Sequence, residues 1–192
     1  MKNEKSKDII LIVILILFVL FVTLIFYNNS QIERAEEFNK YYLKGIVEFN
    51  SGDSDESDAT FNYDLWSSYY DEGYFLDSIE YCVGARNLYA SANSYYQDSI
   101  SNFEEANKIA EEEYKELIDY HIKASYQAIE LNWAMYEACE YFEGASNSYS
   151  KGLWDSGDVD LESGNEKIDL HDSLVRDYNK YISKIKVLEE KI

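Results

Sequence analysis

Two short acidic segments carry the residues of this chain that are best spaced to bind a cation. The carboxylates occupy positions 1, 3 and 12 of a twelve-residue calcium loop, and they are Asp53, Asp55 and Asp64 in the first segment and Asp158, Asp160 and Asp169 in the second. Calcium favours such spacing because it takes six to eight oxygen ligands. Position 6, where the loop requires Gly, is Asp58 or Ser163. We therefore expect these carboxylates to cap helices and keep the protein soluble, with weak calcium binding as the alternative.

Cys82 and Cys139 are the only cysteines in the chain, and they offer the only route to a disulfide within it. A bridge would persist only outside the reducing cytoplasm. Both residues lie on or beside a predicted apolar seam, where free cysteine behaves as a small buried hydrophobe. Two alternatives therefore stay open. The two thiols are either buried and free, or they form a disulfide when the helices fold back on each other.

The histidines, cysteines and carboxylates of the sequence do not form any recognised catalytic motif. His121 and His171 are the only histidines, and the di-metal helical bundles that place Glu three residues before His are excluded because Ile118 and Ile168 stand there. The sequence contains no nucleophile elbow, no phosphate-binding Gly loop and no Cys pair at zinc spacing. We predict a protein that is not an enzyme and that has no cofactor.

The run from Ile9 to Tyr27 indicates where the protein sits. It contains nineteen residues with no charge, no Gly and no Pro. As a helix it would span about 28 Å, close to the roughly 30 Å hydrocarbon core of a bilayer. A cleaved signal peptide has a shorter apolar region, of about 7 to 15 residues, and ends at small residues. We therefore predict a retained single-pass anchor in the cell membrane.

The charges beside this run predict its orientation. Lys2, Lys5 and Lys7 precede it, and basic residues favour the cytoplasmic side. The predicted organisation is a cytoplasmic tail over 1–8, a signal anchor over 9–27 and an extracytoplasmic domain over 28–192. The net charge of -20 repels nucleic acid, so we expect a protein partner, self-association or a cell-surface polymer.

Apolar and small residues recur at heptad spacing through the middle of the chain, which contains no proline to break a helix. The first series is Phe75, Cys82, Tyr89, Tyr96, Phe103, Ala110, Leu117, Ala124, Leu131, Ala138 and Ala145, and a second series runs four residues later. Spacing of this kind is typical of helices that pack with shallow left-handed crossing. The predicted fold is all-α, with an N-terminal transmembrane helix followed by an elongated antiparallel bundle or coiled-coil-like domain.

Two similar segments predict helix reversals. Lys44-Gly45 leads to Ser51-Gly52-Asp53, and Lys151-Gly152 leads to Ser156-Gly157-Asp158. Gly suits the left-handed residue that ends a helix, and Asp suits the start of the next one. We expect helices to about Asn50, from about Asp53, through a central region to about Ser150, and from about Asp158 to Glu190. Within the central region we favour a break near Asn93 over one continuous helix.

One segment resembles a known repeat. Its spaced residues are Leu65, Tyr69, Gly73, Phe75, Ser78, Ile79, Cys82 and Ala85, and their spacing resembles one tetratricopeptide repeat over about 30 residues. The resemblance implies packing of helices in hairpin pairs. The acidic, Tyr-rich composition also looks like that of uncharacterised cell-surface helical proteins of archaea. The function predicted from the sequence is binding or scaffolding without catalysis. The alternative is a sensor ectodomain or an accessory subunit of a membrane signalling or transport complex.

Overall fold

The computed structural model describes residues 2–191, and the side chains of residues 17–191. Residues 2–191 form four helices, α1 (Lys2–Asp71), α2 (Phe75–Ile109), α3 (Glu112–Ser150) and α4 (Trp154–Glu189). No strand occurs among residues 2–191. The all-α prediction is confirmed.

The chain divides into two compact units, one up to Lys40 and one from Tyr41 onward. The first unit is helical, and its apolar side chains such as Phe18, Leu24 and Phe26 are exposed. In the part of the chain that the structure describes, no helix contains a stretch both long and apolar enough to cross a bilayer. The side chains of positions 9–16 of the predicted anchor, and those of the tail over 1–8, lie outside that part. The anchor therefore stays a prediction.

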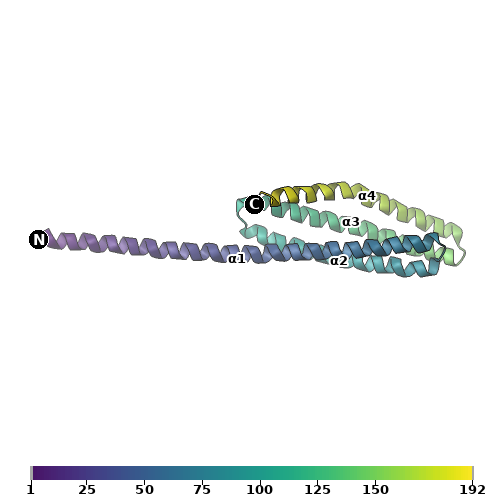
Figure 1. Cartoon of the computed structure of the whole chain (residues 1–192), viewed down its shortest axis with the longest axis horizontal. Coiled ribbons are helices and arrows are strands. Elements are labelled where there is room, and N and C mark those ends of the chain that lie inside the picture. The colour runs from purple at the N-terminus through teal and green to yellow at the C-terminus, as the bar shows by residue number, and fades with distance from the viewer. Residues whose placement is uncertain (1, 192) are drawn as a thin grey trace. The chain divides into compact units, whose positions relative to one another are not determined.

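The second unit is a bundle of four antiparallel helices, in which α2, α3 and α4 lie alongside the later part of α1 (Figure 1). Contacts between α1 and α2 run in opposite directions along the two helices, from Gly45 beside Phe103 to Thr60 beside Tyr89. Tyr178 of α4 reaches back to α1, where its hydroxyl lies 3.3 Å from an oxygen of Asp53. The predicted antiparallel bundle is therefore confirmed for this unit.

The predicted heptad seam is the core of the bundle. From Cys82 to Ala145 every member of the first series is buried. The rings of Trp66 and Phe142 stack at 4.2 Å between centroids, and the indole N–H of Trp66 donates to the hydroxyl of Ser146 at 3.1 Å. Because the seam faces inward on both α2 and α3, these two helices carry most of the core.

The first predicted reversal, at Gly45 to Asp53, is wrong. α1 continues through this segment to Asp71, and the chain turns at residues 72–74, where Gly73 has a φ of 82°. Gly45 and Gly52 are helical, and a Cβ on either would lie 2.8 Å from an aromatic ring of α2. These glycines allow close packing and do not end a helix.

The predicted break near Asn93 is also wrong, because Asn93 lies buried within α2. The central region breaks at Ala110 and Glu111, whose extended backbone separates α2 from α3. The seam passes through this point in phase, since Phe103, Ala110 and Leu117 are all buried. For that reason the periodicity gave no sign of the turn.

The second predicted reversal is confirmed in position. The chain turns at Lys151 and Gly152, where Gly152 has a φ of 74°, a backbone region that glycine adopts without strain. α4 begins at Trp154, four residues before the predicted start at Asp158.

The repeated Ser-Gly-Asp sequence has a different role from the predicted one. The ring of Tyr96 lies on Gly52, and its hydroxyl donates to Asp53 at 2.6 Å. The ring of Tyr149 lies in the same way on Gly157, and its hydroxyl donates to Asp158. In both places Gly makes room for a tyrosine ring and the next Asp accepts its hydrogen.

We expect Gly52→Ala to destabilise the bundle by about 1 to 3 kcal/mol, because the new methyl group would overlap the buried Tyr96 ring. Gly84→Ala is the matched control, since a Cβ there would meet only the Asn62 side chain, at 3.3 Å. Urea unfolding followed by circular dichroism compares the two variants. Equal stability of Gly52→Ala and the unsubstituted protein would contradict the packing argument.

Candidate functional site

The end of the bundle that holds two of the three interhelical turns is rich in aromatic residues. The turn at 72–74 joins α1 to α2, and the turn at 151–153 joins α3 to α4. Rings meet across the two turns, with Phe75 at 5.3 Å from Tyr149 and 6.3 Å from Trp154 between centroids. The contact between Tyr70 and Tyr149 places both turns at one end.

Several large apolar side chains at this end are not covered. We name them the turn patch, and they are Tyr74, Leu76, Leu153 and Trp154, which are between 54% and 68% exposed. Beside them an open pocket of about 410 Å³ is lined by Gly152, Leu153, Trp154, Asp155 and Ser156. Exposed apolar side chains that cluster in one patch often mark an interaction site, whereas single exposed apolar residues are common on any protein surface.

The charges around the turn patch are mostly negative. Residues 71–77 and 151–158 contain five acidic residues, Asp71, Glu72, Asp77, Asp155 and Asp158, against one basic residue, Lys151. An apolar centre with a charged rim is the usual anatomy of a protein interface. The electrostatic potential at this rim favours basic over acidic groups.

A second group of polar residues lies between the helices of the bundle and is open to solvent at Asp53. We name it the polar layer, and it consists of Asp53 and Glu56 of α1, Tyr96 of α2, Asn132 of α3 and Tyr178 of α4. The hydroxyl of Tyr96 lies 2.6 Å from Asp53 Oδ1 and 3.0 Å from Glu56 Oε2. Tyr178 also donates to Asp53 Oδ1, at 3.3 Å. One tyrosine hydroxyl thus joins two carboxyl groups.

Burial dominates the electrostatics of the polar layer. It raises the pKa of Glu56 to about 7, with the Asp53 charge raising the pKa further and the Tyr96 hydrogen bond opposing it. The pKa of Asp53 is also raised by burial, against the hydrogen bonds from Tyr96 and Tyr178. Asn132 is 1% exposed, and its Nδ2 lacks a hydrogen-bond partner.

His121 lies near the opposite end of the bundle from the turn patch, in an aromatic pocket. Its ring stacks on Phe103 at 4.7 Å, and its Nε2 lies 3.5 Å from the Tyr42 hydroxyl and 3.9 Å from Glu189 Oε1. The imidazole is 4% exposed, and its Nδ1 has no partner. Burial lowers the pKa of His121 to about 4. His121 is therefore a neutral core residue near pH 7, whereas His171 lies partly exposed beside Asp172.

Cys82 and Cys139 lie in one core cluster with Tyr89 and Phe142, and both are free thiols. Burial raises the pKa of the Cys82 thiol well above its usual range, and the neighbouring Cys139 adds to this effect. The structure therefore corresponds to the alternative of two buried thiols, with no bridge between them.

We expect neither thiol to react with a disulfide reagent such as 5,5′-dithiobis(2-nitrobenzoate) while the protein is folded, because the reactive species is an accessible thiolate. In urea both thiols should react. Counting released thiolate at 412 nm checks this. Fast reaction of the folded protein would contradict the observed burial, and absence of reaction in urea would reveal a disulfide.

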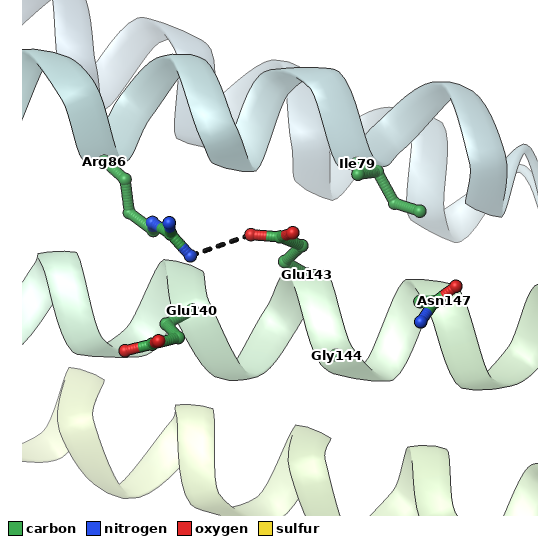
Figure 2. Close-up of a pocket in the computed structure, with 6 residues that line it drawn as sticks. All are labelled: Ile79, Arg86, Glu140, Glu143, Gly144 and Asn147. Carbon is green, nitrogen blue, oxygen red and sulfur yellow. Dashed lines mark hydrogen bonds and ion pairs between the residues drawn. The ribbon is translucent and has the colours of Figure 1, made fainter.

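A smaller pocket of about 350 Å³ lies between α2 and α3 (Figure 2). Arg86 points across it to Glu143, and the two side chains are joined by an ion pair at 2.8 Å. The guanidinium also lies over the ring of Tyr136, at 5.3 Å from its centroid. Arg86 is on the predicted seam, and its contacts hold α2 to α3.

The residues predicted for weak calcium binding are spread along helices. Asp53, Asp55 and Asp64 lie in α1, and Asp158, Asp160 and Asp169 lie in α4, so neither segment forms a loop. Within residues 17–191 no group of three or more His, Cys, Asp or Glu side chains is placed to hold a metal ion. Two of these carboxylates accept tyrosine hydrogens, Asp53 from Tyr96 and Asp158 from Tyr149.

Sequence reasoning missed the turn patch and the polar layer. The high tyrosine content was the available signal, since the chain has nineteen tyrosines. Glu56 is one of 37 acidic residues in the sequence, and no neighbouring residue pattern indicated that it would be buried. Comparisons of this chain with protein families, curated proteins and solved structures find no match.

Proposed function

We propose that this chain is a membrane-anchored, extracytoplasmic helical protein that binds a partner protein through the turn patch and has no catalytic activity. The observation that carries the proposal is the joint exposure of Tyr74, Leu76, Leu153 and Trp154 at one end of the bundle. The anchor rests on the uncharged run from Ile9 to Tyr27, and the orientation rests on the three preceding lysines.

The proposed partner has apolar side chains surrounded by Lys or Arg. This follows from the charges of the rim around the turn patch, which contains five acidic residues and only one lysine. Tryptophan and tyrosine are the side chains that most often carry binding energy at interfaces. Trp154 is the expected central contact, because it is exposed and its ring is fixed against Tyr149 at 5.3 Å.

The test is photo-crosslinking of the full chain in cells, with p-benzoylphenylalanine at position 154. Position 133 is the matched control, because Trp133 is also exposed, at 46%, but lies in the middle of α3. We expect a crosslinked protein from position 154 that is not obtained from position 133, and weaker crosslinking at high salt. Equal crosslinking at the two positions would contradict the turn patch as the binding surface, and an adduct containing only this chain would point to self-association.

The predicted orientation has a separate test. Protease treatment of intact cells should remove the bundle while residues before Ile9 stay protected. Protection of the bundle would place it in the cytoplasm and overturn the extracytoplasmic proposal without affecting the turn patch. A sensor ectodomain or accessory subunit stays the second candidate, and it is favoured by the titratable polar layer inside the bundle.

A further inference from the structure

We propose that the polar layer is a proton-binding site, in which one proton on Glu56 completes the hydrogen bonds that keep α4 docked against α1. The site lies within the second unit of the chain and joins residues of all four helices. The inference is independent of the turn patch and of the membrane anchor.

The geometry leaves the polar layer one hydrogen short. The hydroxyl of Tyr96 has a single proton but lies within hydrogen-bond distance of both Asp53 and Glu56. When both carboxyl groups are ionised, only one of them can accept this proton. When Glu56 is protonated, it donates to the Tyr96 oxygen while Tyr96 donates to Asp53. The chain of hydrogen bonds is then complete.

The surroundings determine which carboxyl group takes the proton. Asp53 reaches solvent and accepts from both Tyr96 and Tyr178, and these contacts oppose the partial burial that raises the pKa of its carboxyl group. Glu56 is less exposed than Asp53 and shares the Tyr96 hydroxyl with it, while the neutral amide of Asn132 lies nearby without completing a hydrogen bond. A buried carboxyl group with few donors favours its neutral form. The raised pKa of Glu56, about 7, agrees with this assignment.

No basic side chain among the groups that act on Glu56 compensates its charge. Those groups are Asp53 on α1, Tyr89 and Tyr96 on α2, Asn132 on α3 and Tyr178 on α4. Ionised Glu56 would face the negative charge of Asp53 across one shared hydroxyl. Loss of the proton should therefore open the layer on its solvent side, between α1 and α4.

α4 is the helix that such a change can move. Its fully buried residues are only three, Gly157, Gly164 and Ile185, whereas α3 has sixteen. The hydrogen bond from Tyr178 to Asp53 ties the later part of α4 to α1. A helix with few buried residues is expected to open more readily than the core helices, and removal of one supporting interaction should shift its population further.

The test is hydrogen exchange of the full chain, measured by mass spectrometry at about pH 6 and about pH 8 with correction for intrinsic exchange rates. For a single group with a pKa near 7, we expect protection of α4 around Tyr178 to fall about tenfold between the two conditions. Glu56→Gln should remove this pH dependence, because the amide supplies the missing hydrogen at every pH. Tyr178→Phe should lower protection of the same segment at both pH values.

Glu130→Gln is the matched control, since Glu130 is an exposed acid on α3 and its removal should leave the pH dependence unchanged. Protection of α4 that does not change with pH in the unsubstituted protein would overturn the proposal. So would a Glu56→Gln variant that keeps the full pH dependence. Addition of calcium chloride at about pH 8 is the remaining arm, and recovery of protection there would show a cation site in place of a proton site.

Discussion

Replacing Trp66 with Ala is expected to lower the free energy of unfolding of the bundle by about 4 kcal/mol. Trp66 is 4% exposed and lies where α1 meets the seam, stacked on Phe142 and Tyr63. Its removal leaves a cavity beside these aromatic rings and leaves the hydroxyl of Ser146 with one donor fewer. Urea unfolding followed by circular dichroism measures the loss.

Two further variants separate the contributions to that loss. Trp66→Phe keeps an aromatic ring but removes the indole N–H, so its cost combines one hydrogen bond of about 1 kcal/mol with a smaller cavity. Trp133→Ala removes a tryptophan of which nearly half is exposed, and it should change stability by less than about 1 kcal/mol. A similar loss from Trp66→Ala and Trp133→Ala would show that Trp66 does not anchor α1 to the core.

The second large effect is acid destabilisation through His121. Its pKa is about 4 in the folded protein and near 6.5 when unfolded. Between these two values the unfolded state binds more protons than the folded state, so stability falls as the pH is lowered. The full contribution is present above about pH 6.5, and up to about 3 kcal/mol is lost by pH 4.

His121→Phe should remove this sensitivity, because a phenyl ring can keep the stack on Phe103 and cannot be protonated. Glu56 acts in the opposite direction, since its folded pKa lies above its unfolded value and it stabilises the fold as the pH falls from about 7. The measurement is therefore the difference in unfolding free energy between variant and unsubstituted protein, at several pH values from about 7 to 4. A difference that stays constant with pH would rule out His121 as its source.

The sequence predicts the core of this fold well because the heptad rule depends only on which residues face inward. The series from Cys82 to Ala145 is buried as expected. The turns are predicted less well because glycine serves two purposes. Gly152 ends a helix, as expected, whereas Gly45 and Gly52 lie within a helix against aromatic rings. Sequence alone does not distinguish these two roles, because the difference depends on whether an aromatic ring of the neighbouring helix packs against the glycine.

The polar layer could not be predicted for a related reason. Its members are far apart in the chain, with Asp53 and Tyr178 separated by 125 positions. The spacing of acidic residues near Asp53 suggested a calcium loop, which requires a chain that curves around the ion. A continuous helix spreads those carboxylates around its axis instead, and the partners of Asp53 turn out to be tyrosines on α2 and α4.

The pairing of tyrosine with a Gly-Asp step also fixes how the helices align. Gly45 and Gly52 are seven residues apart in α1, as are Phe103 and Tyr96 in α2, so glycine spacing alone would tolerate a slide of one heptad. After such a slide the Tyr96 hydroxyl would meet Ile46 in one direction or Thr60 in the other, and no carboxylate would receive it. The same check operates at Tyr149 and Asp158, between α3 and α4. The contact between the tyrosine ring and the glycine sets how closely the two helices pack. The Asp that follows the glycine favours one alignment of the helices over alignments shifted by seven residues.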